Sequence, residues 1–156
     1  MGKKLFRMRL SGSLPLRRPP ADVKIVAYDR DRHHEPIRYV YAGAFGEDPW
    51  PADWDDIEEF DPNGVFVAVH EPTSDVVGFV VSFRREEDGY ISVVAVLPAY
   101  QRRGIASTMV AAAVDYLRSL GLEEFLIDAF VTSKPAVATY RSLGFRVVKI
   151  FEDSTS

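Results

Sequence analysis

The fold of this chain is decided by residues 98–106, Pro-Ala-Tyr-Gln-Arg-Arg-Gly-Ile-Ala. They follow the apolar run 90–97, Tyr-Ile-Ser-Val-Val-Ala-Val-Leu, which is typical of a buried strand, and they lead into segment 105–120, which has a helical pattern. The start of a helix binds anions well, because its first backbone amides are unpaired and its dipole favours negative charge. Gly104 lacks a Cβ and lets a ligand approach the backbone, and two neighbouring arginines add positive charge. The stretch therefore predicts a strand–turn–helix unit with an anion site in the turn.

Length and composition are those of a single globular domain. A chain of 156 residues is long enough to close one hydrophobic core, and 47% hydrophobic with 27% charged residues is ordinary for such a domain. The absence of cysteine excludes disulfides, thiolate metal sites and a cysteine nucleophile. No apolar run approaches the ~18 residues of a membrane helix, and no signal-peptide pattern is present. We therefore expect a cytoplasmic protein with no membrane partner.

Charge is distributed unevenly along the chain. Segment 1–20 contains six of the 19 basic residues and no acidic residue, so the remainder is strongly acidic although the net charge is only −4. A basic arm can indicate nucleic-acid binding, but six charges are weak support, and an acidic body repels phosphate backbones. We therefore expect no nucleic-acid partner.

Periodicity along the chain predicts a mixed α/β fold. Alternating or β-branched runs indicate strands, apolar residues at steps of three and four indicate helices, and Gly121 and Gly144 are typical of helix ends. The expected strands are 23–28, 65–70, 76–84, 90–97, 125–130 and 145–151, and the expected helices are 31–45, 53–60, 105–120 and 134–143. This order predicts a central mixed sheet flanked by helices, with a parallel crossover through helix 105–120.

Two motifs carry a family resemblance. The order Gln-Arg-Arg-Gly-Ile-Ala at 101–106 resembles the acyl-CoA pyrophosphate loop of the GNAT superfamily of N-acetyltransferases, Gln/Arg-x-x-Gly-x-Gly/Ala; the plainer alternative is an ordinary basic turn. Segment 136–145 looks like the second family signature, in which a tyrosine protonates the departing thiolate. Tyr140 matches that position, and its alternative is a core residue with a solvated hydroxyl. The expected element order is also similar to the GNAT fold, so the resemblance covers residues 21–152.

The resemblance implies a set of acyl-CoA contacts. The strand before the loop would align pantetheine, the loop and the following helix start would bind pyrophosphate, and a serine would replace the asparagine that the family places near pantetheine. The residues implied are Val94, Ala95, Val96, Gln101, Arg102, Arg103, Gly104, Ile105, Ala106, Ser107 and Ser133. The co-substrate implied is acetyl-CoA. No metal is expected, because His33, His34 and His70 lack the spacing of a metal site and are interpreted as surface or helix-start residues.

The acceptor side is less defined than the acyl-CoA side. The family often has a glutamate in the strand before the loop, near the position of Tyr90 here, so the general base would be a water chain or a carboxylate of the first helices. Acidic residues beside Trp50 and Trp54 suit a cationic amine, and the alternative is a solvated acidic helix anchored by the two tryptophans. The acidic residues are Glu47, Asp48, Asp53, Asp55, Asp56, Glu58 and Glu59.

The two ends of the chain contain a further expected strand pair. A GNAT domain usually closes with two antiparallel strands, whereas here only 145–151 follows the last helix. Segment 3–10 alternates like a strand and precedes a flexible linker at 11–13, so we expect it to pair with 145–151. Such a displaced final strand would indicate circular permutation, and the alternative is a natural N-terminal arm that is disordered or exchanged with a neighbouring subunit. The chain thus divides into a basic segment, 1–20, and a GNAT-like acetyltransferase domain, 21–156.

Together these patterns predict an acetyl-CoA-dependent N-acetyltransferase that moves an acyl group directly from CoA to a primary amine. The amine would belong to a small molecule or a peptide, and a homodimer is consistent with the family. One alternative is a catalytically inactive CoA-binding regulatory or structural domain, and another is a binding module that uses the acidic and aromatic wall without CoA. Neither the acceptor amine nor the acyl-chain length follows from the sequence.

Overall fold

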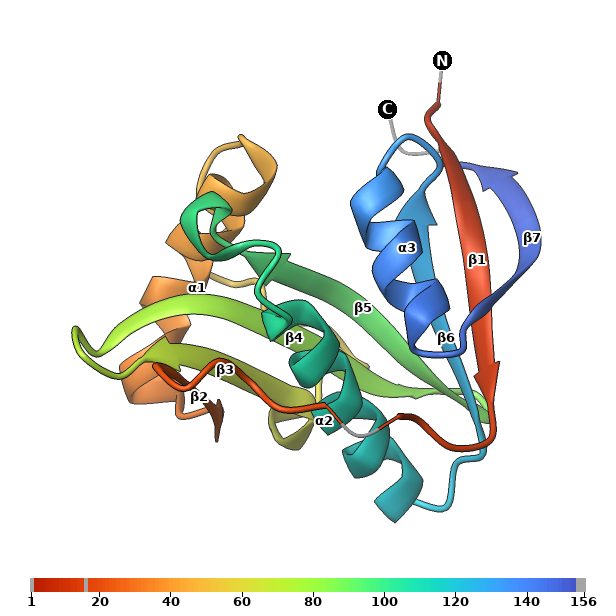
Figure 1. Ribbon diagram of the computed structural model, residues 1–156, viewed down its shortest axis with the longest axis horizontal. Coiled ribbons are helices and arrows are strands. Elements are labelled where there is room, and N and C mark those ends of the chain that lie inside the picture. The colour runs from red at the N-terminus through yellow and green to blue at the C-terminus, as the bar shows by residue number, and fades with distance from the viewer. Residues whose placement is uncertain (1, 16, 154–156) are drawn as a thin grey trace.

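The computed structural model describes residues 2–15 and 17–153. The strands are β1 (Lys4–Ser11), β2 (Val23–Ala27), β3 (Val65–His70), β4 (Asp75–Arg85), β5 (Asp88–Val96), β6 (Glu124–Phe130) and β7 (Arg146–Glu152), and the helices are α1 (Arg30–Phe45), α2 (Ile105–Ser119) and α3 (Lys134–Ser142). Within the described residues the strands form one seven-stranded sheet in the order β2-β3-β4-β5-β6-β1-β7. The mixed sheet flanked by helices that the sequence predicts is confirmed (Figure 1).

Strands β5 and β6 separate after a short paired stretch, which divides the sheet into two halves. They run parallel, and the described pairing joins only 89–91 to 125–127, whereas β5 pairs antiparallel with β4 from end to end. Figure 1 shows the two strands diverging beyond that stretch, with α2 and α3 on the near face of the sheet and α1 on the far face. The last part of β5 therefore has an open edge toward β6.

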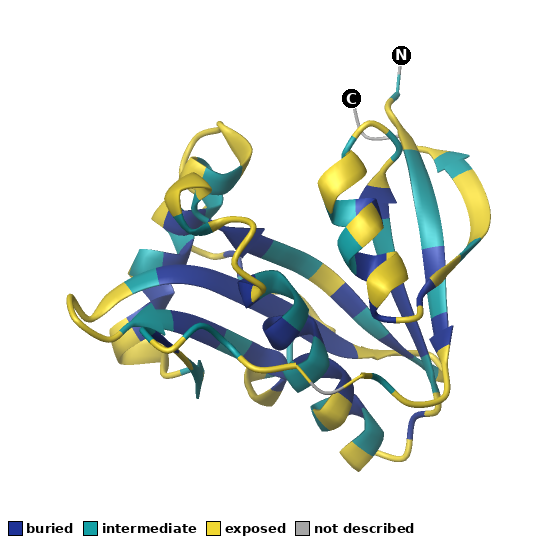
Figure 2. Ribbon diagram, in the orientation of Figure 1, coloured by how far each residue is buried: buried dark blue, intermediate teal, exposed yellow. Residues whose placement is uncertain are grey.

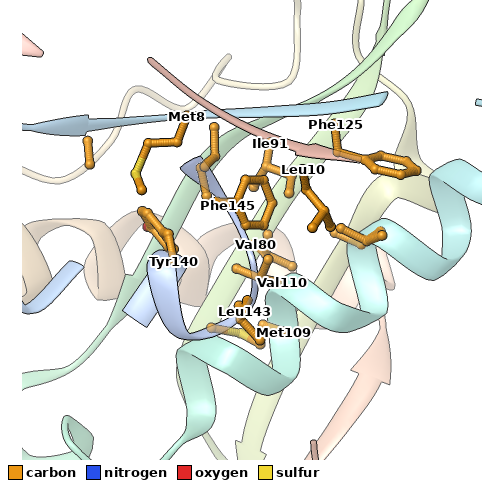
Figure 3. Packing of buried hydrophobic residues seen from close by; sticks show 14 of the residues in the cluster. Met8, Leu10, Val80, Ile91, Met109, Val110, Phe125, Tyr140, Leu143 and Phe145 are labelled. Atoms are coloured by element: carbon orange, nitrogen blue, oxygen red, sulfur yellow. The ribbon is translucent and has the colours of Figure 1, made fainter. Parts of the chain in front are cut away.

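The larger of two apolar clusters lies between the sheet and helices α2 and α3, and the smaller lies beneath α1. Figure 2 shows the buried positions running along the sheet, with exposed positions in the turns and on β7. The larger cluster contains Met8 and Leu10 of β1 together with Phe125 and Phe145 (Figure 3). Burial of each such side chain stabilises the fold by about 1.5–3 kcal/mol. Because Met8 and Leu10 are 0% and 1% exposed, β1 is an integral part of the core.

Strand β1 lies between β6 and β7 and is antiparallel to both. Beyond the strands, the Asp153 amide donates to the Lys3 carbonyl at 2.7 Å, so the start of β1 and the end of β7 lie side by side (Figure 1). The expected pairing of segment 3–10 with 145–151 is thus confirmed.

The helix expected at 53–60 is absent from the described chain, and that prediction was wrong. This part forms separate turns, in which the Trp54 amide donates to the Pro51 carbonyl at 3.0 Å and the Asp56 amide donates to the Asp53 carbonyl at 2.8 Å. So short a segment does not form a helix unaided. Because Trp54 is 7% exposed and packs in the cluster beneath α1, tertiary contacts determine the backbone there.

His33 and His34 were expected at the surface or at a helix start, and they lie at the start of α1, where both are buried. His33 accepts a hydrogen bond from the Asp29 amide at 2.9 Å through Nδ1, and burial lowers its pKa. His34 bonds to the Ala52 carbonyl through Nε2 at 2.6 Å, and its ring stacks on Trp54 with 5.1 Å between centroids. Both histidines therefore stabilise the helix start and the turns beside it.

The described residues contain no group of three or more side chains that could hold a metal ion. In the same ranges, no helix combines the length and the apolar content needed to cross a membrane.

Candidate active site

A cavity of about 410 Å³ lies where β5 separates from β6. It is lined by the end of α1, the end of β5, the loop 100–104, and the first turns of α2 and α3. Two helix N-termini thus border one cavity, and each favours negative charge through its dipole.

The loop before α2 has the backbone conformation of an anion site. Arg102 and Gly104 have positive φ angles of 64° and 83°, and an alternation of φ signs turns successive amides toward a common side. No side chain caps the N-terminus of α2. In the described chain no amide from 102 to 107 donates to a carbonyl. These amides are therefore available to an anionic ligand, as the sequence predicts.

The end of β5 supplies an open strand edge beside this loop. Val94, Ala95 and Val96 pair with β4 on one side, and the described pairing gives them no strand on the β6 side. An extended ligand with amide groups can bind to such an edge as an added strand would. The side-chain amide of Gln101 donates to the Val96 carbonyl at 2.9 Å, which ties the loop to the end of the strand.

Tyr140 of α3 reaches the same cavity from the core. It is 7% exposed, and burial raises the pKa of its phenol far above the ordinary value of 10. Within the described residues its hydroxyl has no hydrogen-bond partner, and Phe145 lies beside its ring with centroids 6.3 Å apart. A phenol held neutral and unpaired at a cavity wall is able to donate a proton to a reacting atom.

The structure brings nearly all of the predicted site residues together. The cavity is lined by Val94, Ala95, Val96, Gln101, Arg102, Gly104, Ile105, Ala106, Ser107, Ser133 and Tyr140. Arg103 is the exception, because its guanidinium turns away and Nη2 lies 2.5 Å from Oδ1 of Asp22. The prediction that Arg103 lines the site with Arg102 is therefore not supported.

Sequence reasoning missed several lining residues. They are Ala44, Phe45, Tyr100, Pro135, Ala136 and Thr139. Tyr100, Pro135, Ala136 and Thr139 lie within or beside the two motifs, so the motifs themselves could have indicated them. Ala44 and Phe45 come from the end of α1 and carry no local signal.

Tyr90 lies near the position at which the family often has a glutamate, and its hydroxyl is engaged by a neighbouring carboxylate. Its hydroxyl donates to Oδ2 of Asp128 at 2.9 Å, and burial together with that carboxylate raises its pKa to about 12. Arg7 donates to both oxygens of Asp128, at 2.9 and 3.0 Å. This network ties β5, β6 and β1 together at the point where the sheet halves meet, so its carboxylate is structural.

A second cavity, of about 710 Å³, lies beside the first at the end of α1. It is lined by residues 46–51 and Tyr41, so it includes Glu47, Asp48 and Trp50, and it begins next to Phe45 of the first cavity. Tyr41 stacks on Trp50 at 4.9 Å and donates to Glu47 at 3.2 Å.

The acidic and aromatic wall expected from the sequence is therefore divided. Trp54 stacks on Trp50 with 5.0 Å between centroids and is a buried anchor, as the alternative interpretation held. Asp53, Asp56, Glu58 and Glu59 are solvated, and Asp55 pairs with Arg30. The part of the wall at 47–50 lines the second cavity.

An open strand edge, a loop of free amides and a buried tyrosine surround one cavity of this mixed α/β fold. Residues 30–145 match the model of the acetyltransferase (GNAT) family. The chain therefore belongs to the GNAT acetyltransferase family.

Similar proteins agree with this assignment. A mycothiol acetyltransferase of Mycobacteroides abscessus is 30% identical over 93% of this chain and 53% of its own length. A mycothiol acetyltransferase of Thermobispora bispora is 31% identical over 90% of this chain and 53% of its own length. The structure of a GCN5-related N-acetyltransferase from Sphaerobacter thermophilus superposes with a TM-score of 0.81 at 18% identity, covering 97% of this chain and 50% of that one. The chain spans about half the length of the curated relatives it matches.

Proposed function

We propose that this domain is an acetyl-CoA-dependent N-acetyltransferase that moves the acetyl group directly to a primary amine. One observation carries the proposal: the open edge of β5 leads into the uncapped start of α2, with the Tyr140 hydroxyl at the same cavity. Pantetheine amides suit a strand edge, and a pyrophosphate suits a helix N-terminus.

In the proposed reaction the acceptor nitrogen attacks the carbonyl carbon of the thioester. A backbone amide of the β5 edge stabilises the oxyanion, the C–S bond then breaks, and Tyr140 donates its proton to the departing sulfur. The amine loses one proton to water or a carboxylate, and Tyr140 regains one from solvent. Because the chain has no cysteine, no acyl-cysteine intermediate forms on the protein. Most of the acceleration comes from holding the two substrates together.

The second cavity supports a cationic acceptor. Glu47 and Asp48 are exposed carboxylates that line this cavity together with Trp50, and charge attraction favours an ammonium group there. Replacing Glu47 by glutamine should raise the KM of a diamine acceptor and leave the KM of acetyl-CoA unchanged in steady-state assays. Equal changes in both constants would remove this cavity from the proposal.

A catalytically inactive CoA-binding domain is the second candidate function. It is favoured by one observation, namely that no aspartate or glutamate is found among the described residues lining the acyl-CoA cavity. Both candidates require CoA binding, and only the first requires turnover. The homodimer and the cytoplasmic location stay predictions from the sequence.

The test of the acyl-CoA site is the shift in melting temperature on adding acetyl-CoA, with Gly104→Glu as the site variant. Gly121→Glu is a matched control at the opposite end of α2, because the φ angles are +83° and +89° and a Cβ at either position meets nothing within 4 Å. A ligand at ~100 times its Kd stabilises by about 2.7 kcal/mol, or roughly 5–10 °C for a chain of this size. The parent and Gly121→Glu should show the shift, and Gly104→Glu should lose it. No shift in the parent at saturating ligand would refute the proposal.

The place of β1 is also part of this proposal. We infer that the domain is a circularly permuted GNAT fold, whose final strand precedes the rest of the chain. The inference is supported by the position of β1 between β6 and β7 and by the Lys3–Asp153 hydrogen bond. Joining residue 153 to residue 3 through a short turn and reopening the chain at Gly12 should keep cooperative unfolding and acetyl-CoA binding. A rejoined chain that does not fold would contradict the permutation and favour a natural N-terminal arm.

A further inference from the structure

Arg103 is held on the outside of the anion-binding loop by an acidic partner from a distant part of the chain. Its Nη2 lies 2.5 Å from Oδ1 of Asp22, which immediately precedes β2, and its guanidinium lies 5.7 Å from the centre of the Tyr100 ring. The hydrogen bond from Arg103 is the largest cause of a lowered pKa at Asp22. The pair therefore joins the loop to the opposite edge of the sheet.

A second set of contacts orients the Asp22 carboxylate. Nε2 of His70 lies 3.3 Å from Oδ2 of Asp22, and Nδ1 of His70 lies 2.8 Å from Oγ1 of Thr73. With Nδ1 unprotonated, the His70 ring accepts from the Thr73 hydroxyl, whose oxygen accepts from the Asp75 amide at 3.4 Å, and Nε2 faces the Asp22 carboxylate. The His70 ring also packs against Tyr100, with centroids 5.3 Å apart. Each oxygen of Asp22 thus has its own partner, and the network extends to the turn between β3 and β4.

The loop conformation depends on support of this kind. Arg102 has a φ angle of 64°, which a residue with a side chain adopts only when its surroundings hold it there. Its neighbour Arg103 is clamped to Asp22, and on the other side Gln101 is tied to the end of β5. Both anchors flank the strained residue, so together they fix the free amides of the loop toward the cavity.

We propose that Asp22, oriented by His70, is a positioning residue for acyl-CoA binding, acting through Arg103 on the loop 101–106. The inference rests on the proposed function of that loop. The proposal and simple electrostatics predict opposite changes in affinity when Asp22 is removed. If charge alone mattered, losing a carboxylate near the anion site would remove a repulsion and strengthen anion binding. If Asp22 positions the loop, its loss weakens anion binding.

The experiment measures the Kd of CoA by calorimetry, and the KM of acetyl-CoA and kcat by steady-state kinetics, for Asp22→Ala, Asp22→Glu and Arg103→Ala. Glu71→Gln is the charge control, since Glu71 is an exposed acid whose amide donates to the Asp22 carbonyl, and the described ion pair of Arg103 is with Asp22. Asp22→Ala should raise both the Kd of CoA and the KM of acetyl-CoA about two- to fivefold, the range for an exposed ion pair, with kcat unchanged. Asp22→Glu should restore binding, and Glu71→Gln should leave it equal or tighter.

The double variant of Asp22→Ala with Arg103→Ala tests whether Asp22 acts through Arg103. It should bind CoA no more weakly than Arg103→Ala alone, because coupled residues are not additive. Unchanged or tighter binding in Asp22→Ala, with the parent binding normally, would overturn this inference and leave the proposed function intact. A parent protein that binds no CoA would overturn the proposed function and this inference with it.

Discussion

Replacing Tyr140 by phenylalanine should remove turnover without affecting the fold. The Tyr140 hydroxyl has no hydrogen-bond partner in the described residues, and its ring packs in the main core cluster. The variant keeps that ring and loses only an unpaired polar group, so the free energy of unfolding should change by less than ~0.5 kcal/mol. The missing proton donor should lower kcat by about 10²–10⁴-fold, and the Kd of acetyl-CoA should stay unchanged.

Tyr116→Phe is the matched control, because it makes the same chemical change on a neighbouring helix with the opposite expectation. The Tyr116 hydroxyl donates to the carboxylate of Asp61, and the residue lies eleven positions beyond the start of α2, roughly 16 Å along the helix. Removing it breaks a charge-assisted hydrogen bond. Its variant should therefore lose about 1–2 kcal/mol of stability and keep full kcat.

The assay follows the free CoA thiol released on turnover, with a diamine as acceptor. The protein contributes no background to a thiol reagent, because it has no cysteine. Urea unfolding of the same samples gives the stabilities. If Tyr140→Phe kept kcat within about threefold of the parent, the assignment of Tyr140 as general acid would be wrong. A parent that bound acetyl-CoA but released no thiol with any amine would favour the inactive CoA-binding domain.

Two further predictions concern stability. Leu10→Ala should lower the free energy of unfolding in urea by about 2–5 kcal/mol, because Leu10 is 1% exposed in the core. The control Leu120→Ala, at a 43% exposed position, should lower it by less than ~0.5 kcal/mol. Equal losses in the two variants would contradict an integral β1. At alkaline pH, Tyr90 keeps its proton in the folded state up to a pKa of about 12, whereas an unfolded tyrosine loses it near 10. Stability from this difference is complete below pH 10 and is lost as the pH rises toward 12, so Tyr90→Phe should fall less steeply over that range, and identical curves would show that Tyr90 does not contribute.

Local patterns predict those parts of the fold in which local preference and burial agree. The alternation of 3–10 predicts β1 because Met8 and Leu10 alternate toward the core, and that alternation is a property of any strand with one buried face. The same reasoning holds for α2, whose buried face recurs at helical spacing and whose end is marked by Gly121. The residues of the candidate site were instead named from the two motifs that carry the family resemblance, and part of the site lies in the loop between β5 and α2.

Other features depend on partners far away in the chain, and local patterns are insufficient there. The turns at 51–59 replace an expected helix because Trp54 is drawn into a stack with His34 and Trp50. His33 and His34 are buried by contacts that only the folded chain provides. The hydrogen bond from Tyr90 to Asp128 likewise joins two strands that the crossover through α2 separates in the chain. In each case the residue type is compatible with several environments, and the tertiary contact selects one.

The two arginines of the loop have different surroundings that a sequence pattern does not distinguish. Arg102 and Arg103 are equivalent in a sequence pattern, and both were expected to add positive charge to the anion site. The structure separates them, because Arg103 pairs with Asp22, 81 residues away, and only Arg102 lines the cavity. Under the proposed function, the pair with Asp22 offsets one of the two charges, so more of the affinity for a pyrophosphate comes from backbone amides than a count of arginines indicates. The same proposal makes Asp22 matter more to binding through the backbone conformation of Arg102 and Gly104 than through the charge that it cancels.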